Sequence, residues 1–393
     1  MNSAINKFKG KRILVWGYGR EGKSTENFFK VHNLAQSVEI YEGSREGIDE
    51  SKYDFIFKSP GISAWDLSDK FTSQTELFLE AFGDRVIGIT GTKGKSTTST
   101  MLYTVLSKCM KSKVFLLGNI GEPCLNYFDE IKEDSIVVFE MSCHQLAHNK
   151  ISPHVAVFLN LFEEHLDYYG TMDKYFAAKT NVTVYQSADD YFYVGDNVPK
   201  IQTDARVEVV DKPLDVNMKL LGEHNRFNAA FVKEIAVALY GCDEAAVLNV
   251  IRDFTGLPHR LELVLEKDGV RYYDDSISTI PEATIKAVES IDNVKTVLVG
   301  GMDRNIDYSI LEEYIAKKQE VVFICMYESG RRIFDKVSAC ANVIYKDDLE
   351  QAVAEAKRIT PSGYACVLSP AAASYGYFEN FEDRGNKFKA FCQ

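Results

Sequence analysis

A short run of residues combines glycines, a lysine and a hydroxyl side chain in the order of a phosphate-binding turn. It reads Gly88-Ile-Thr-Gly-Thr-Lys-Gly-Lys-Ser-Thr97, between an apolar stretch that predicts a strand and one that predicts a helix. Glycines let the main chain fold around an anion, and the first N–H groups of a helix point toward it. Lys95 can reach the β- and γ-phosphate oxygens, and the Ser96 hydroxyl can bind Mg²⁺. We therefore expect an ATP site made by Gly91, Thr92, Lys93, Gly94, Lys95, Ser96 and Thr97.

An acidic residue stands where a second predicted strand ends. Glu140 follows the apolar residues 136–139. The carboxyl ends of parallel strands share one edge of a sheet, so this carboxylate is expected near Ser96. Carboxylate oxygens are the ligands that Mg²⁺ prefers. Glu140 is thus a candidate metal ligand, and a plain solvated strand end is the alternative.

The beginning of the chain carries a second glycine-rich turn. Gly17-Tyr-Gly-Arg-Glu-Gly22 follows the predicted strand 12–16 and precedes a predicted helix, and Glu42 stands twenty residues after the last glycine. This pattern is typical of a dinucleotide-binding unit, and so of an NAD(P)-dependent oxidoreductase. Any other diphosphate could bind the same turn. The residues alone leave both interpretations open.

Strands and helices alternate along the whole chain, which predicts an α/β protein with parallel sheets. We expect three domains. They are a Rossmann-like domain at residues 1–83, a central P-loop ATPase-type parallel sheet at 84–257 and a Rossmann-like α/β domain at 258–393. The turn Thr255-Gly-Leu-Pro258 marks the second boundary.

Composition excludes several classes of protein. The chain has 393 residues, with 45 Lys and Arg against 57 Asp and Glu, a net charge of −12. An acidic balance disfavours non-specific nucleic-acid binding. No apolar run approaches the ~20 residues that span a bilayer. The eight cysteines include no Cys-x-x-Cys pair, which is typical of reduced thiols. We expect a cytoplasmic monomer that binds small molecules.

Further motifs occur in a characteristic order. They lie at residues 118–121, 140–146, 160–167, 178–179, 222–228, 256–260 and 274–276. Together with the variant turn Thr90-Gly-Thr-Lys-Gly-Lys-Ser-Thr97, they resemble the Mur ligase family, the ATP-dependent amide-forming enzymes of peptidoglycan precursor synthesis. The runs 368–374 and 381–386 resemble the branch that adds glutamate to UDP-N-acetylmuramoyl-L-alanine.

The resemblance implies a reaction. In this family ATP phosphorylates a carboxylate, and an amine attacks the resulting acyl phosphate. Two Mg²⁺ ions are implied, with Ser96, Glu140, His165 and Lys179 as their ligands. Lys179 would take up CO₂ to become a carbamate, which supplies anionic oxygen atoms. The implied catalytic residues are Lys95, His165, Lys179 and Arg260.

The resemblance also assigns binding residues. Further ATP contacts would come from Asn225, Asn228, Arg260 and Asp275. The first glycine turn would hold the uridine diphosphate of the sugar-peptide substrate. That substrate would be bound by Gly17, Gly19, Arg20, Glu21, Glu42, Ser59, Pro60, Gly61, Asn119 and His165. Glutamate would be bound by Thr279, Arg304, Ser374 and the main chain at Phe381.

One residue departs from the pattern of the glutamate-adding branch. Ile277 follows Asp275-Ser276 where the branch commonly has lysine. The loss of this cation would change how the protein binds the carboxylates of the incoming amino acid. D-glutamate is the expected substrate, and L-glutamate is an alternative. A ligase similar to folylpolyglutamate synthetase is a second alternative, because it shares the ATP half.

Overall fold

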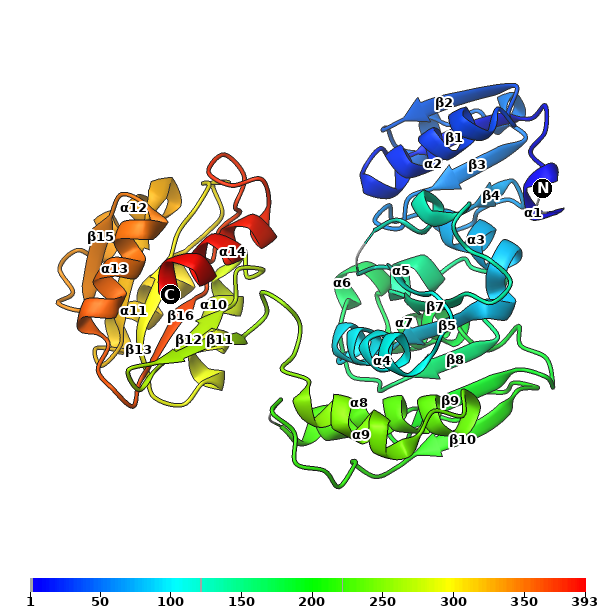
Figure 1. Ribbon diagram of the computed structural model, residues 1–393. Coiled ribbons are helices and arrows are strands. Elements are labelled where there is room, and N and C mark those ends of the chain that lie inside the picture. The colour runs from blue at the N-terminus through cyan, green and yellow to red at the C-terminus, as the bar shows by residue number, and fades with distance from the viewer. Residues whose placement is uncertain (1–2, 121, 221) are drawn as a thin grey trace. The chain divides into compact units, whose positions relative to one another are not determined.

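The computed structural model describes residues 3–120, 122–220 and 222–393, and it divides into two compact units (Figure 1). The first unit is Met1–Phe254 and the second is Thr255–Gln393. Gly121, the last residue of the motif at 118–121, lies outside the described residues. Strands form three sheets, two in the first unit and one in the second.

The N-terminal sheet has the order β2-β1-β3-β4, and its strands are parallel. Phenylalanines from both the sheet and α2 pack edge to face around Phe8. The strands are β1 (Arg12–Trp16), β2 (Ser37–Tyr41), β3 (Phe55–Lys58) and β4 (Phe71–Thr72), and the helices are α1 (Ser3–Asn6), α2 (Arg20–His32) and α3 (Gln74–Phe82).

The central sheet is parallel throughout, in the order β10-β9-β8-β5-β7-β6. Strand β5 lies in the middle, and every residue of β5 and β7 is buried, which explains their continuous apolar runs. The strands are β5 (Val86–Thr90), β6 (Val114–Gly118), β7 (Ile136–Glu140), β8 (Val155–Phe158), β9 (Tyr191–Gly195) and β10 (Arg206–Val210).

Helices cover both faces of the central sheet. One face packs against α4 (Lys95–Cys109), α8 (Glu223–Glu234) and α9 (Glu244–Asp253). The other face shares a core with α3, since the rings of Phe78 and Phe139 lie 5.5 Å apart. This core joins the N-terminal and central sheets in one unit. The remaining helices are α5 (Cys143–Leu146), α6 (Leu166–Tyr169), α7 (Met172–Thr180) and the π-helical turn Ile235–Leu239.

The second unit contains one sheet in the order β11-β12-β16-β13-β14-β15, in which only the β11–β12 pair is antiparallel. The predicted hairpin at residues 267–269 forms, with positive φ at both Asp268 and Gly269. The strands are β11 (Glu262–Lys267), β12 (Val270–Asp274), β13 (Val294–Val299), β14 (Val322–Met326), β15 (Val343–Lys346) and β16 (Ala365–Leu368). The helices are α10 (Pro281–Ser290), α11 (Ser309–Lys317), α12 (Tyr327–Val337), α13 (Leu349–Ile359) and α14 (Phe381–Cys392).

The predicted α/β class with parallel sheets is confirmed. Among the described residues, no helix combines the length and apolar character that crossing a membrane requires. The predicted boundary at residues 83–84 falls on the short link between α3 and β5, inside the first unit. The other falls within a few residues of the division between the units.

Candidate active site

The phosphate turn forms where β5 ends and α4 begins. Gly91 and Gly94 have φ angles of +151° and +82°, which disfavour any side chain. A Cβ atom on Gly94 would lie 2.5 Å from Oδ1 of Asn228, so α8 packs directly against the turn. The structure thus places Asn228 beside the predicted ATP site. Asn225, one turn earlier on α8, accepts a hydrogen bond from Nδ2 of Asn228 at 3.3 Å.

The residues after β8 hold the turn in shape. The main-chain N–H of Thr92 donates to the carbonyl oxygen of Asn160 at 2.9 Å. The side-chain amide of Asn160 pairs with the main chain of Lys93 in both directions, at 2.9 and 3.0 Å. Thr92 Oγ1 accepts from the N–H of Phe162 at 2.9 Å. These bonds pre-organise the loop for an anion.

Two lysine ammonium groups converge on this turn. Lys95 Nζ donates to the carbonyl oxygens of Gly91 and Thr92, at 3.0 and 3.1 Å. Lys179 Nζ, from α7, donates to the Gly91 oxygen at 2.9 Å. The Lys179 side chain is only 1% exposed, and burial lowers its pKa to about 7. Burial also lowers the pKa of Lys95. The site therefore concentrates positive charge and holds an amine that is easily deprotonated.

Glu140 ends β7 beside the turn, because β7 pairs with β5 and Ile89 lies opposite Glu140. Its side chain is 1% exposed. Oε1 accepts a hydrogen bond from Nδ2 of Asn119 at 2.7 Å, and Oε2 has no partner among the described residues. A buried carboxylate oxygen without a donor fits a divalent cation. The bond to Asn119 also links the candidate metal ligand to a candidate substrate residue.

His165 precedes α6 in a left-handed conformation, with φ of +57°. Its ring lies 6.0 Å from that of Tyr175, on the helix that carries Lys179. The ring of His144 lies 5.1 Å from that of His165, and Cys143 Sγ contacts Nδ1 of His144 at 3.4 Å. The sequence analysis gave Cys143 and His144 no role, although both belong to the motif at residues 140–146.

The first glycine turn lies at the carboxyl end of β1. Gly17 has φ of +93°, and a Cβ on Gly22 would lie 2.1 Å from the Gly17 oxygen, so both positions require glycine. Ser59 Oγ donates to the Gly17 oxygen at 2.9 Å. Glu21, in the first turn of α2, accepts from Nε2 of Gln145 at 2.9 Å, which ties the turn to α5.

The other predicted substrate residues surround this turn. Pro60 and Gly61 continue from Ser59, and Tyr41, next to Glu42, accepts a hydrogen bond from the N–H of Gly17. The exposed members of the set are Gly19, Arg20, Glu42, Gly61, Asn119 and His165.

In the second unit, the predicted ATP contacts lie together. Asp275 is buried, and its carboxylate accepts from Ser278 Oγ at 2.6 Å, Ser369 Oγ at 2.7 Å and the N–H of Leu261 at 3.2 Å. Burial raises the pKa of Asp275 to about 6, against the opposing effect of these donors and the charge of Arg260. Arg260 itself is exposed.

The predicted glutamate residues also lie in the second unit. An Nη atom of Arg304 donates to the carbonyl oxygen of Thr279 at 3.2 Å. The carbonyl oxygen of Phe381 accepts from Ser276 Oγ at 2.8 Å. Ser374 is buried, and its carbonyl accepts from the main chain at Phe378. The structure brings Thr279 and Arg304 together and fixes Phe381 beside the loop that carries them.

Two buried contacts that the sequence did not predict fix this loop, and one of them holds it to α14. Arg384 is 0% exposed and donates from Nε and Nη2 to the hydroxyl and carbonyl oxygens of Ser276, at 3.0 and 2.8 Å. Nδ1 of His259 lies 2.7 Å from Oδ2 of Asp274. A Cβ on Gly385 would lie 2.1 Å from that nitrogen. The motifs contain all of these residues, so their presence together was the available signal.

The Mur ligase middle domain matches residues 89–207, and the glutamate ligase domain of Mur ligases matches residues 259–372. In fold, the chain is similar to the MurF ligase of Thermotoga maritima in complex with ADP, with a TM-score of 0.54 and 17% identity over 100% of this chain and 98% of that one.

Curated relatives match along the full length. The UDP-N-acetylmuramoylalanine–D-glutamate ligase of Ligilactobacillus salivarius is 30% identical, over 98% of this chain and 96% of the relative. The UDP-N-acetylmuramoyl-L-alanine–L-glutamate ligase of Salinispora tropica is also 30% identical, over 98% of each chain. The resemblance predicted from the motif order is thereby confirmed: this chain belongs to the Mur ligase family.

Proposed function

We propose that this protein is an ATP-dependent ligase that joins glutamate to UDP-N-acetylmuramoyl-L-alanine and releases ADP and phosphate. The observation that carries the proposal is the phosphate turn, where the Lys95 and Lys179 ammonium groups and the unpartnered Glu140 oxygen gather at the carboxyl edge of one sheet. The names of the full-length relatives from Ligilactobacillus salivarius, Acetivibrio thermocellus and Aquifex aeolicus support it.

The proposed reaction begins with the L-alanyl carboxylate. Its oxygen attacks the γ-phosphorus of ATP, a new O–P bond forms, and the bond to the β-phosphate oxygen breaks. The main-chain N–H groups of residues 91–96 and the Lys95 ammonium group would neutralise the charge on the phosphoryl oxygens. For this, Lys95 Nζ has to leave the Gly91 and Thr92 oxygens that it contacts at 3.0 and 3.1 Å.

The amine of glutamate then attacks the acyl phosphate. A C–N bond forms, the amine loses a proton, and the C–O bond to phosphate breaks. Arg304 and the residues around Thr279 would hold the glutamate carboxylates, since a guanidinium group pairs well with a carboxylate. Asn225 and Asn228 are the proposed ATP contacts of the first unit, and Arg260 and Asp275 are those of the second.

Ser96, Glu140, His165 and a modified Lys179 would hold two Mg²⁺ ions. Such ions would neutralise charge at the phosphates and at the attacking carboxylate. A Lys179 pKa of about 7 leaves much of the amine neutral at neutral pH, and a neutral amine is the form that attacks CO₂. The N–C bond forms, a proton leaves, and the resulting carbamate is anionic.

We propose D-glutamate as the amino acid, in agreement with the names of most of the relatives cited here. L-glutamate is the second candidate because Ile277 replaces a cation and because the Salinispora tropica relative is named for L-glutamate. An ATP-dependent ligase has a functional role for the phosphate turn and for Glu140. An NAD(P)-dependent oxidoreductase would have no role for either, so this alternative is disfavoured. The folate-type ligase is disfavoured by the first glycine turn of this chain and by its C-terminal runs at residues 368–374 and 381–386.

The test is a phosphate-release assay with ATP, Mg²⁺ and UDP-N-acetylmuramoyl-L-alanine, with D- and L-glutamate supplied separately. We expect release that depends on the UDP substrate and on D-glutamate. Release with L-glutamate but not with D-glutamate would identify L-glutamate as the substrate. Equal release without any amino acid would contradict the proposed ligase reaction.

A further inference from the structure

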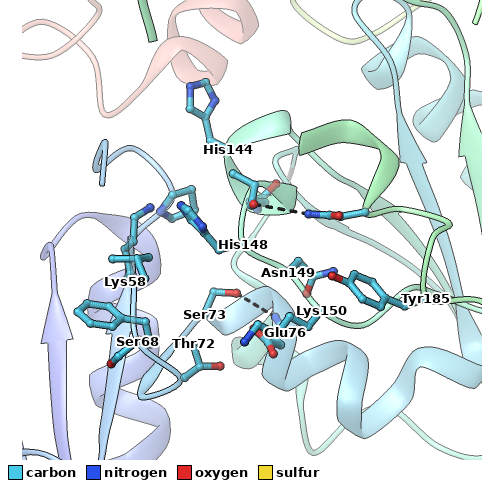
Figure 2. A pocket seen from close by; sticks show the side chains of 16 residues that line it. Lys58, Ser68, Thr72, Ser73, Glu76, His144, His148, Asn149, Lys150 and Tyr185 are labelled. Carbon is cyan, nitrogen blue, oxygen red and sulfur yellow. Dashed lines mark hydrogen bonds between the residues drawn. The ribbon is translucent and has the colours of Figure 1, made fainter. Parts of the chain in front are cut away.

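A pocket of about 240 Å³ lies in the first unit, between the end of β3 and the residues that follow α5 (Figure 2). Lys58 of β3 and Thr72 of β4 line it from the N-terminal sheet, Ser68 lines it from the segment between these strands, and His148 and Asn149 line it from the other side. Apart from Pro60, none of its lining residues belongs to the sets assigned above to ATP, metal, the UDP substrate or glutamate. The pocket therefore needs an explanation of its own.

Lys58 supplies a buried positive charge. Its side chain is 7% exposed, and Nζ makes a hydrogen bond of 3.4 Å to the Ser59 carbonyl oxygen. Among the described residues, no carboxylate lies within 4 Å of this ammonium group, which has three hydrogens to donate. Burial lowers the pKa of Lys58 to about 8, and the negative charge of Glu21 opposes that shift. Burying a charge without a partner is costly, so an anion at this place would be retained.

Two hydrogen-bond acceptors on residues that line the pocket have no partner within the described part of the chain. They are Nε2 of His148 and Oδ1 of Asn149, and both atoms are buried among the described residues. Asn149 is 1% exposed. Burial and the charge of Lys58 lower the pKa of His148, and a neutral imidazole keeps one nitrogen as an acceptor. A ligand that satisfied the whole pocket would accept from Lys58 and donate to these atoms.

The other charged groups around the pocket determine its net charge. Lys150 pairs with Asp69 at 2.9 Å, so these two neutralise each other. Glu76 lines the pocket, and burial raises its pKa. Phe71 and Tyr185 add apolar surface. Lys58 is thus the charge that a ligand would meet without competition from an ion pair.

We propose that this pocket binds an oxyanion that also carries hydroxyl hydrogens, the chemistry of hydrogen phosphate or of a phosphorylated sugar. The anionic oxygens accept from Lys58, and the hydroxyl groups donate to His148 and Asn149. Water alone would satisfy the two acceptors but would leave the buried charge unpaired. A metal cation is excluded by the ammonium group.

The oxyanion has two possible sources. Pro60 belongs both to this pocket and to the predicted UDP site, so the diphosphate of the substrate can supply it. Free phosphate, a product of the proposed reaction, is the other source. Only the substrate source rests on the proposed function, because binding of inorganic phosphate requires no ligase activity.

The experiment is calorimetric titration of the full chain with inorganic phosphate and, separately, with UDP. Lys58→Met removes the charge and keeps the chain length, and His148→Phe removes the acceptor and keeps a ring. Lys52→Met, an exposed lysine of the same unit, is the control. Lys58→Met should fold, because it removes an unpaired buried charge. Binding at the phosphate turn is common to all four proteins and cancels in the comparison.

We expect Lys58→Met to weaken the binding of phosphate, of UDP or of both by about tenfold or more, as for the loss of a charged hydrogen bond. His148→Phe should weaken the same ligand less, and Lys52→Met should match the wild type. Loss confined to phosphate identifies a free-anion site, and loss confined to UDP identifies a substrate subsite. Unchanged affinities for both ligands in Lys58→Met and His148→Phe would overturn the proposal, whatever the ligase assay shows.

Discussion

The two glycine-rich turns of the first unit have the same connection, but they differ in the charged side chains nearest to them. Both join the carboxyl end of a parallel strand to the start of a helix, and both need glycines at positive φ, Gly17 in one and Gly91 and Gly94 in the other. The ammonium groups of Lys95 and Lys179 contact the second turn. At the first glycine-rich turn, a carboxylate, Glu21, lies in the first turn of helix α2, next to Arg20.

The difference shows that the connection supplies main-chain donors and the surrounding side chains select the ligand. A cationic turn beside an unpartnered carboxylate oxygen suits a nucleotide triphosphate with its metal. Glu21 opposes an anion at the first turn, although it is held by Gln145 and lies in the field of Lys58. That turn therefore suits a ligand held by many contacts beyond its phosphates. Four experiments test this contrast.

The largest effect is expected from Lys95→Met. This change removes the charge nearest the transferred phosphoryl group, so phosphate release should fall by about 10²–10³. Because burial already disfavours the ammonium form, thermal stability should not fall. Lys108→Met, exposed near the end of the same helix, is the control and should keep full activity. Normal turnover in Lys95→Met would end the assignment of the turn to ATP.

Lys179→Ala should reduce activity by about 10² or more, in line with the loss of a metal-holding group. Added bicarbonate should restore wild-type enzyme depleted of CO₂ and should fail to restore this variant. Lys174 lies on the same helix with an exposed side chain, so Lys174→Ala is the control and should respond to bicarbonate as the wild type does. Full activity in Lys179→Ala would remove the carbamate from the account.

Gly22→Ala and Gly19→Ala separate packing from flexibility at the first turn. A Cβ on Gly22 would lie 2.1 Å from a main-chain oxygen, and one on Gly19 would meet nothing within 4 Å. Gly22→Ala should therefore lower the free energy of unfolding by about 1–3 kcal/mol and weaken UDP binding. Gly19→Ala should change the unfolding free energy little. Denaturant titration of both variants measures these free energies of unfolding. Equal stabilities of the two variants would refute the close approach of α2 to β1.

The smallest effect is expected from Glu21→Gln, which removes the opposing charge at the first turn. UDP should bind roughly two- to fivefold more tightly. Burial raises the pKa of Glu21, so the folded state favours the protonated carboxyl group. Wild-type stability should therefore fall, relative to the variant, as pH rises from about 4 toward neutrality. Melting temperatures that differ by a constant amount across this range would contradict the raised pKa.

Local pattern was enough to predict the elements that position the phosphate turn. β5 and β7 are wholly buried and so read as continuous apolar runs, and the glycines between β5 and α4 mark the turn. Strand β10 was not predicted, although Arg206-Val-Glu-Val209 alternates polar and apolar residues; four of its five residues are exposed at the edge of the sheet. Strand β9 was missed as well, although Gly195-Asp-Asn197 marks a turn at its end, and no sequence signal distinguishes the π-helical turn from the helix before it.

Contacts between distant residues could not be predicted. Arg384 reaches Ser276 across more than a hundred residues, and Lys179 reaches Gly91 across eighty-eight. Sequence placed each of these residues in a motif, but only packing decides which atoms meet. Lys58 gave no signal at all, since a lysine at a strand end is ordinarily solvated. Its burial depends on α5 and the loops that close over it.

The most direct test of the central claim is to follow a heavy-oxygen label placed in the L-alanyl carboxylate of the UDP substrate. In the proposed reaction, that carboxylate attacks the γ-phosphorus and later loses one of its oxygens to the phosphate. Mass spectrometry of the released phosphate should therefore find one labelled oxygen for each amide bond formed. Product formation with all of the released phosphate unlabelled would contradict activation of the carboxylate at the phosphate turn.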